Sequence, residues 1–581
     1  MNKRTMIAAM LLAAGVLSAM AQMRTDDEML SIARKRLDTP NRAKRQMGNN
    51  ENQTLATVAE DSQYKMFAGN GGYVIVARNE AFSPIIGYSN ESDGLIEIPC
   101  CMQDCLDMIN ENLEVRARNG IKAKATGKDN ATYEVVSPLL TTYWQQGSPY
   151  NLKCPADYTG KTSLTGCVAT AMAMVVRYFK YPSSVSNKSV AYAYKTDSKG
   201  TASDSVHVTI NSTYDWNNMR DTYPSSATTA EKNAVSQLMF DCGAAAGLNY
   251  GSSATGGSVT TAARRFYEVF GYAAVNHTSK DYYTDYEWRQ LVYDQLMAGC
   301  PLMHSGTDSE FGGHAFVLDG IDAEGMVHVN WGWGKSSAGY FDMLALTPTT
   351  TTRSYNFKAN GFIYGLKAAP QLGEGEEQEY QLVVGRGTGD YKNDSYNISI
   401  KNNRVILNTG GVFNWTPVHF KGYTGVRYES LDGGSNYDVR TKSPTGGTYV
   451  ALDINSRVGK SYGGYDADHD QTPSGIKPGK YRVFFACFND DKNNLKYRSP
   501  IRQRYEGAIY WELTVADDGT LTLSDKKVAN SPETVIPTGI ASIPTGREAV
   551  RDNKTYNLNG QRVNDSYKGI IIRNGRKIFR K

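Results

Sequence analysis

The segment Thr165–Phe179, which reads TGCVATAMAMVVRYF, constrains the fold of this 581-residue chain more than any other. Its large apolar residues recur at helical spacing, and its alanines allow other elements to pack closely, so we expect a buried central helix. Pro182 stops that helix, and Gly166 allows an unusual turn before it. Cys167 then falls in the first turn, where backbone N–H groups and the helix dipole favour a nucleophilic thiolate. The alternative is a small buried cysteine that merely lies at a helix start.

A thiol nucleophile needs a base, and His314 is the candidate that the local sequence favours. Gly312–Gly320 reads GGHAFVLDG, which places His314 at the start of an alternating strand, after two glycines that permit close approach. It follows Cys167 by 147 residues. Papain-type enzymes place their histidine roughly 130–150 residues downstream. His304 fits this distance too but lies in a polar Ser-Gly-Thr-Asp-Ser stretch, and His328 fits a strand position better.

The base needs a group that orients it, and Met326–Gly334, which reads MVHVNWGWG, supplies candidates. Asn330 can accept a hydrogen bond from an imidazole N–H, and Trp331 or Trp333 can shield that contact from water. The alternative is an aromatic-rich core strand.

Acyl transfer also needs an oxyanion hole. The backbone N–H of Cys167 is one candidate donor. Tyr143–Asn151, YWQQGSPYN, offers Gln145 and Gln146 as side-chain donors, although glutamines are more often surface residues.

These four motifs, in this order, closely resemble the streptopain family of secreted bacterial cysteine endopeptidases over about residues 136–367. The resemblance implies an α+β, papain-like fold of two subdomains and a Cys-His thiolate mechanism through an acyl-enzyme, with no metal or organic cofactor. It implies that Cys167 is the nucleophile, His314 the general base and acid, and Gln146 the oxyanion donor. It assigns orientation of the histidine to Trp331, with Asn330 as second choice.

Members of this family are made as zymogens, so the resemblance also implies that the chain's own prodomain inhibits it by occupying the cleft. GGYVIVA from Gly71 and PIIGYS from Pro84 resemble that proregion, and the basic stretch 117–130 is a natural place for its removal. Cys154 and Cys300 are departures from the family pattern that would interfere by oxidation if they lay near the site.

The chain divides by composition and patterning into successive segments. Lys3 and Arg4, an apolar run to Leu17 and an Ala-Met-Ala end are typical of a signal peptide. Helices are predicted over 25–38 and 99–118 and around 229–248 and 286–298, and strands within 64–88. Short alternating strands separated by turn residues predict a β-sandwich-like domain beyond a Gly/Glu-rich linker. The expected segments are a signal peptide (1–21), an inhibitory prodomain (22–130), a catalytic domain (131–367), a linker (368–379), a β-sandwich-like accessory domain (380–535) and a strand-rich tail (545–581).

Charge and composition restrict the partners. With 63 basic and 59 acidic residues the net charge is +4, too small at this length to indicate nucleic acid or an anionic membrane as the main partner. No stretch after the leader reaches the about 20 apolar residues that a spanning helix needs. We therefore expect protein and peptide substrates, no nucleic acid, no transmembrane segment, and a location outside the cell or on its outer surface.

Several alternatives stay open at this stage. The fold also serves other acyl transfers, such as those of transglutaminases and cell-wall amidases, and an inactive protease-like domain can serve in binding. The cluster Cys100, Cys101 and Cys105 has no nearby histidine, which argues against zinc, and Asp466–Asp470 is more simply a solvated acidic loop than a calcium site. The tail resembles short sorting modules of secreted Bacteroidetes proteins, although a terminal β-hairpin explains it equally well.

Overall fold

The structure is a computed structural model in which most of the chain between Met23 and Val528 is described, together with four strands near the C-terminus. The expected signal peptide, the connector after Arg118 and the linker after Ala368 lie outside the described residues, as do Asp466–Asp468 and the side chains of Cys100, Cys101 and Cys105. The described ranges, with short internal gaps, are 23–37, 55–118, 133–346, 357–368, 380–528 and, in part, 555–580.

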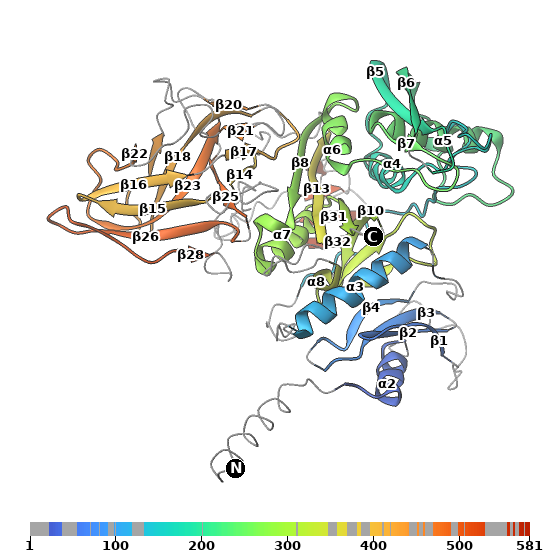
Figure 1. The fold of residues 1–581 in the computed structure, drawn as a ribbon, viewed down its shortest axis with the longest axis horizontal. Coiled ribbons are helices and arrows are strands. Elements are labelled where there is room, and N and C mark those ends of the chain that lie inside the picture. The colour runs from blue at the N-terminus through green and yellow to red at the C-terminus, as the bar shows by residue number, and fades with distance from the viewer. Residues whose placement is uncertain are drawn as a thin grey trace, which may run out of the picture. The chain divides into compact units, whose positions relative to one another are not determined.

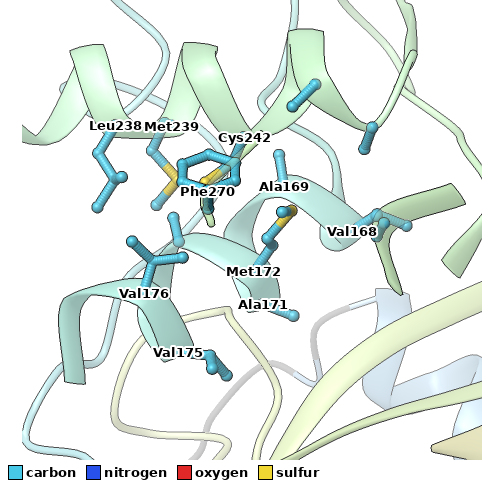
Figure 2. Close-up of a cluster of buried hydrophobic side chains, with 14 of the residues drawn as sticks. Val168, Ala169, Ala171, Met172, Val175, Val176, Leu238, Met239, Cys242 and Phe270 are labelled. Carbon is cyan, nitrogen blue, oxygen red and sulfur yellow. The ribbon is translucent and has the colours of Figure 1, made fainter. Parts of the chain in front are cut away.

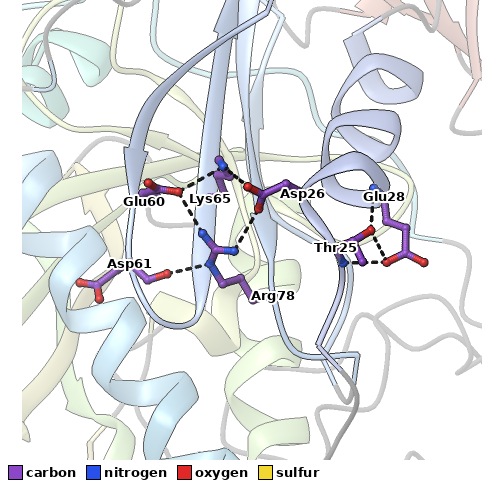
Figure 3. A network of polar contacts seen from close by, with 7 residues as sticks. All are labelled: Thr25, Asp26, Glu28, Glu60, Asp61, Lys65 and Arg78. Carbon is purple, nitrogen blue, oxygen red and sulfur yellow. Dashed lines mark hydrogen bonds and ion pairs between the residues drawn. The ribbon is translucent and has the colours of Figure 1, made fainter.

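Two helices and a four-stranded meander form the described N-terminal part. Thr25 caps the first helix: its hydroxyl accepts from the backbone N–H of Glu28, whose carboxylate accepts from the N–H of Thr25 at 2.7 Å. Lys65 and Arg78 both form ion pairs with Asp26 and with Glu60, which fastens the helix to the strands (Figure 3). The elements are α2 (Asp26–Leu37), β1 (Ala56–Glu60), β2 (Tyr64–Gly69), β3 (Gly72–Ala77), β4 (Ile85–Ser89) and α3 (Cys100–Arg118), close to the helices and strands predicted there.

The predicted central helix is α4 (Cys167–Phe179), and it is buried almost throughout. Every residue from Val168 to Val176 is buried, and the helix packs beneath α5 (Thr229–Ala245) (Figure 2). The predicted helix over 229–248 thus ends at Ala245, where Gly247 adopts a positive φ of 65°. The remaining elements on this side are the hairpin β5 (Ser184–Lys195) and β6 (Ser203–Thr213), η1 (Trp216–Asn218), β7 (Asn249–Tyr250) and α6 (Val259–Glu268).

One ten-stranded sheet joins the N-terminal meander to the central part of the chain. Its order is β1-β2-β3-β4-β12-β11-β10-β9-β13-β8. The junction is the pairing of β4 with β12, in which Tyr88 lies opposite Tyr340 and Gly87 opposite Phe341. The central elements are β8 (Tyr272–Ser279), η2 (Lys280–Tyr282), α7 (Asp285–Met297), β9 (Leu302–Asp308), β10 (Gly312–Ile321), β11 (Val327–Asn330), β12 (Gly339–Phe341), α8 (Met343–Leu346) and β13 (Phe357–Ala368).

The predicted β-sandwich-like region follows, as three sheets around one hydrophobic core (Figure 1). Its strands are β14 (Leu382–Val384), β15 (Tyr396–Lys401), β16 (Arg404–Thr409), β17 (Val412–Asn414), β18 (Phe420–Ser430), β19 (Tyr437–Arg440), β20 (Val450–Leu452), β21 (Arg457–Val458), β22 (His469–Asp470), β23 (Gly479–Asn489), β24 (Arg498–Pro500), β25 (Arg502–Gln503), β26 (Ile509–Val515), β27 (Leu521–Leu523) and β28 (Lys527–Val528). The α+β class predicted from the sequence is confirmed.

The last residues form a separate compact unit, Pro537–Lys581. Its described strands make one sheet in the order β30-β29-β31-β32. The strands are β29 (Thr555–Asn557), β30 (Arg562–Val563), β31 (Gly569–Arg573) and β32 (Arg576–Arg580).

Candidate active site

Cys167 is the first residue of α4, and a glycine sets the turn that presents it. Gly166 is the N-cap, with φ 84° and ψ 147°, a conformation essentially restricted to glycine. A Cβ at this position would lie 2.9 Å from the Thr255 side chain, so the space is closed as well. The side chain of Cys167 is only partly exposed, at the N-terminal end of the helix.

The thiol meets the strand that carries His314. Cys167 Sγ lies 4.0 Å from the carbonyl oxygen of Gly313, the residue immediately before His314. β10 also packs on α4, and Ala315 and Val317 lie in the core cluster that surrounds the helix. Two motifs 147 residues apart in sequence therefore meet at the first turn of α4. His314 itself is half-buried.

The two other histidines weighed as bases have different surroundings. His304 is 1% exposed, with its ring 4.5 Å from that of Phe316 and 5.0 Å from that of Phe362. Burial lowers the pKa of His304 to about 3. His328 is also buried, and its Nδ1 lies 2.6 Å from a carboxylate oxygen of Asp319. The polar loop expected around His304 is instead the inner strand β9.

Trp331 lies on the same side of β10 as His314. Alternate residues of a strand share a face, so His314 and Phe316 point to one side. The ring of Phe316 lies 4.6 Å from that of Trp331, which is 2% exposed and meets Phe341 edge-on at 5.1 Å. Gly332 then turns with φ 74°, and a Cβ there would be 3.1 Å from Thr170 in the first turns of α4. The indole is thus held between the sheet and the helix end.

Asn330 is fully buried, and its amide is already engaged. Its Nδ2 donates to the carbonyl of Thr142 at 2.7 Å, and its Oδ1 accepts from the N–H of Gly332 at 3.3 Å. These contacts do not support the second-choice expectation that Asn330 orients His314.

Gln146 lies beside the residues that lead into α4. Its backbone carbonyl accepts from the N–H of Thr165 at 3.1 Å, two residues before Cys167. The residue is 7% exposed, and its side-chain amide makes no hydrogen bond to any residue that the structure describes. That amide therefore has donors available, on a residue whose backbone is bonded to the approach to Cys167. Gln145 instead lies near Gly334, with Nε2 3.7 Å from a Cβ built there.

Sequence reasoning missed the loop that supports this approach to α4, residues 251–257. Thr255 Oγ1 donates to the carbonyl of Leu164 at 2.8 Å and accepts from the N–H of Gly251. Ser252 donates twice to Asp157, at 2.7 Å each. Burial alone would raise the pKa of Asp157, but these bonds and those from Thr159 hold it well below its usual range. The only signal in the sequence was a Gly- and Ser-rich run, which equally suits any loop.

The cysteines expected to interfere by oxidation are buried. Cys154 and Cys300 are each at most 9% exposed, and burial raises their thiol pKa values to about 12 and about 11. A raised pKa keeps the thiol protonated and unreactive. Cys242 lies between α4 and α5 in the core (Figure 2).

The N-terminal part contacts the segment that follows Trp331. Tyr73 Oη donates to the carbonyl of Ser337 at 2.9 Å. Tyr88 Oη donates to Asp322 at 2.7 Å, and the Arg36 guanidinium lies over the Tyr88 ring. The described residues of this part thus contact the edge of the sheet and the Trp331–Gly339 segment; the expected insertion into the cleft is not seen in these contacts.

The site combines a thiol at a helix N-terminus with a neighbouring strand that carries an imidazole, and a buried indole lies close to that strand. This is the arrangement of a thiol hydrolase.

The comparisons with known proteins agree. The model of the peptidase C10 family matches residues 144–341. Streptopain of Streptococcus pyogenes is 30% identical over 310 residues, which is 50% of this chain and 75% of that protein. The thiol protease/hemagglutinin PrtT of Porphyromonas gingivalis is 27% identical over 294 residues, covering 48% of this chain and 33% of PrtT.

Two solved structures are also similar. A fragment of Prevotella intermedia prointerpain A is 30% identical, covers 54% of this chain and 98% of the fragment, and has a TM-score of 0.48. Active interpain A of the same organism is 37% identical, covers 41% of this chain and 97% of that structure, and has a TM-score of 0.36.

The chain belongs to the peptidase C10 family, the streptopain family of cysteine peptidases. The family and the enzyme class predicted from the sequence, a cysteine-type endopeptidase acting on proteins, are confirmed. No helix among the described residues is long and apolar enough to cross a membrane.

Proposed function

We propose that this chain is an exported cysteine endopeptidase in which Cys167 attacks the substrate, His314 transfers the protons and Gln146 supplies an oxyanion donor. The observation that carries the proposal is the contact between Cys167 Sγ and the backbone of Gly313, next to His314, at the N-terminus of α4. The free side-chain amide of Gln146 beside Thr165 supports its part.

The reaction has two steps. The Cys167 thiolate forms a bond to the scissile carbonyl carbon, the carbonyl oxygen takes negative charge, and the N–H of Cys167 and the Gln146 amide stabilise it. The C–N bond then breaks, and the His314 imidazolium gives its proton to the leaving amine. In the second step His314 takes a proton from water, whose oxygen attacks the thioester. The products are a carboxylic acid and the regenerated thiol.

Orientation of His314 is assigned to Trp331. Its indole packs against Phe316, which shares a strand face with His314, and its burial keeps water from that side of the imidazole. The amide of Asn330 is engaged elsewhere, which favours Trp331 over Asn330 for this role.

Residues 22–130 are proposed to act as the inhibitory prodomain and residues 131–367 as the catalytic domain, with 368–379 as a linker to the accessory domain 380–535. The pairing of β4 with β12 and the bond from Tyr73 to Ser337 support this, because they hold the segment that carries Trp331. Removal of the prodomain would release that segment.

Export rests on the leader at 1–21, and outer-surface delivery on the tail at 545–581. Deletion of residues 554–581 is expected to leave the enzyme in the cell fraction. Extracellular activity equal to that of the full chain would show that the tail only forms a terminal sheet.

The proposal is tested with Cys167→Ala and, as a matched control, Cys154→Ala, which replaces a buried thiol of the same core cluster. The full chain and the control are expected to shorten to an active form that cleaves casein and to be trapped by an epoxide inhibitor, whereas Cys167→Ala does neither. Processing of Cys167→Ala at the normal rate in isolation would contradict the nucleophile assignment. Modification of glutamine side chains without new N-termini would favour a transglutaminase instead.

A further inference from the structure

The segment that ends in Gln146 is fixed to the strand of the catalytic histidine by backbone bonds. Val136 exchanges two hydrogen bonds with Ile321, each 2.9 Å. The N–H of Leu139 donates to the carbonyl of Asp319, and the N–H of Leu140 donates to its carboxylate at 3.0 Å. The segment therefore runs beside β10 as far as Leu140.

Beyond Leu140 the segment is held from β11 and the turn after it. The Asn330 amide donates to the carbonyl of Thr142 at 2.7 Å. Further along both segments, the N–H of Gly334 donates to the carbonyl of Trp144 at 3.4 Å, a longer and weaker bond. Among the described residues, Asn330 is the side chain of β11 that hydrogen-bonds to the 142–146 segment, whereas His328 bonds to Asp319.

The far end of the same short segment is tied to the approach to Cys167. Gln146 accepts from the N–H of Thr165 through its backbone carbonyl. Only three residues separate Thr142, held by Asn330, from Gln146, held by Thr165. The two aromatic residues between them, Tyr143 and Trp144, also donate to backbone carbonyls of residues 220–221. Because the stretch is this short, we expect a shift at Thr142 to change the place of Gln146 relative to the thiol.

We propose that Asn330 is a positioning residue that acts on the oxyanion donor: its amide sets the place of Thr142–Gln146, and hence of the Gln146 amide, relative to Cys167. The inference rests on the proposed function, because it needs Gln146 as the donor. It differs from the expected role in orienting His314. The Asn330 carbonyl oxygen, the group that would accept from the imidazole, already accepts from Gly332.

The two roles predict different reactivities of Cys167. Alkylation of the thiolate by iodoacetamide needs His314 but passes through no oxyanion, whereas hydrolysis of a peptide anilide needs both. Each full-length variant is matured by a trace of unmodified enzyme, and its active sites are counted with an epoxide inhibitor. For Asn330→Ala we expect kcat to fall about 10- to 100-fold, as for loss of part of an oxyanion hole, with KM within about threefold. The alkylation rate and its pH profile should stay within about twofold.

Asn414 offers a matched control in the β-sandwich-like region. It too is fully buried, donates through Nδ2 to a carbonyl, that of Val418, and accepts from the N–H two residues later, that of Thr416. Asn414→Ala should lose comparable stability and keep kcat. Asn330→Asp keeps the acceptor but loses the donor until the carboxyl is protonated, so its kcat relative to unmodified enzyme should rise as the pH falls.

The Gln146→Ala background completes the test. There, adding Asn330→Ala should lower kcat by less than about threefold, since no positioned donor remains to be displaced. Equal loss of alkylation and hydrolysis, a displaced alkylation pH profile or full additivity with Gln146→Ala would each overturn the inference. Normal kcat in Gln146→Ala itself would instead refute the oxyanion assignment in the proposed function.

Discussion

At the scale of single residues, the structure gives the three histidines that were weighed as the base different surroundings. His304 and His314 both fit the expected spacing from Cys167, and His328 lies 14 residues beyond His314. His304 is stacked on one phenylalanine and meets another edge-on. His328 hydrogen-bonds to Asp319, and His314 follows the residue whose carbonyl contacts the thiol. Burial and hydrogen-bond partners, which depend on the fold, favour His314 as the proposed base.

His304 should make the enzyme sensitive to acid through its stability. Both ring nitrogens lack a hydrogen-bond partner among the described residues, and burial lowers its pKa from 6.5 to about 3. Between these values the unfolded chain binds the proton and the folded chain does not. The free energy of unfolding therefore falls as the pH drops below about 6.5, by about 2 kcal/mol at about pH 5, and is unaffected above that range.

His304→Leu should remove this part of the pH dependence, since leucine has no proton to bind, and should leave stability near neutral pH equal or higher. Urea unfolding of the inactivated protein at about pH 6.5 and about pH 5 measures this change in the free energy of unfolding. His207→Leu, at an exposed position of β6, is the control and should keep the acid sensitivity of the parent. If His304→Leu loses as much unfolding free energy on acidification as the parent does, groups other than His304 cause the acid sensitivity.

At the scale of elements, the start of α4 depends on one backbone conformation. The helix was predicted from its apolar spacing, but the geometry of Gly166 and its fit against Thr255 come from a loop about 90 residues away. The same loop holds Leu164 through Thr255. The position of the thiol is therefore set by two segments together.

Gly166→Ala is expected to lower both stability and hydrolysis, because alanine is strained at φ 84° and its Cβ meets Thr255. Gly160→Ala is the matched control: Gly160 has φ 74° with no atom within 4 Å of an added Cβ. The control should lose roughly 1–2 kcal/mol from backbone strain alone and keep its activity. Thermal unfolding and casein cleavage report the two effects. Equal activity in both variants would show that the turn at Gly166 does not position Cys167.

At the scale of the whole molecule, the central and β-sandwich-like regions share a buried ionic contact. Arg502 is 1% exposed, donates to Glu287 at 2.8 Å and to the carbonyl of Tyr282, and lies over the ring of Tyr283. Arg504 pairs with Asp281 beside it. Glu287 also caps α7 through Thr284, so the contact joins a helix start to β25. The accessory region is therefore held against the catalytic part, beyond the covalent linker.

Arg502→Ala should weaken this contact strongly, since it leaves the Glu287 carboxylate buried without its partner, which typically costs about 3–5 kcal/mol. Arg404→Ala, which breaks an equally short but exposed pair with Asp470, should cost less than about 1 kcal/mol. Urea unfolding measures both. Limited proteolysis between residues 368 and 380 should become faster only in Arg502→Ala. Equal losses in the two variants would mean that the regions do not depend on this pair.

Much of the fold was available from local patterns. Periodicity and capping predicted α2, α3, α4, α5 and α7 and the strands of the N-terminal meander, because those signals act within a few residues. The hairpin β5–β6 and helix α6 were not predicted. The hairpin strands are largely polar and exposed, so they show little of the apolar alternation that marks a strand. Helix α6 is short, although its Ser258 cap and single buried face are local signals that could have found it.

The sequence by itself determined the enzyme class and the candidate thiol, imidazole and amide, since these rest on residue types in order along the chain. Only the tertiary structure decided the surroundings of individual side chains, such as the partners of Asn330 and the burial of His304 and Cys154. It also decided that the N-terminal meander joins the central sheet through β4 and β12. The physical reason is that a side chain's hydrogen bonds and solvent contact are set by segments far away in the chain, which only folding brings beside it.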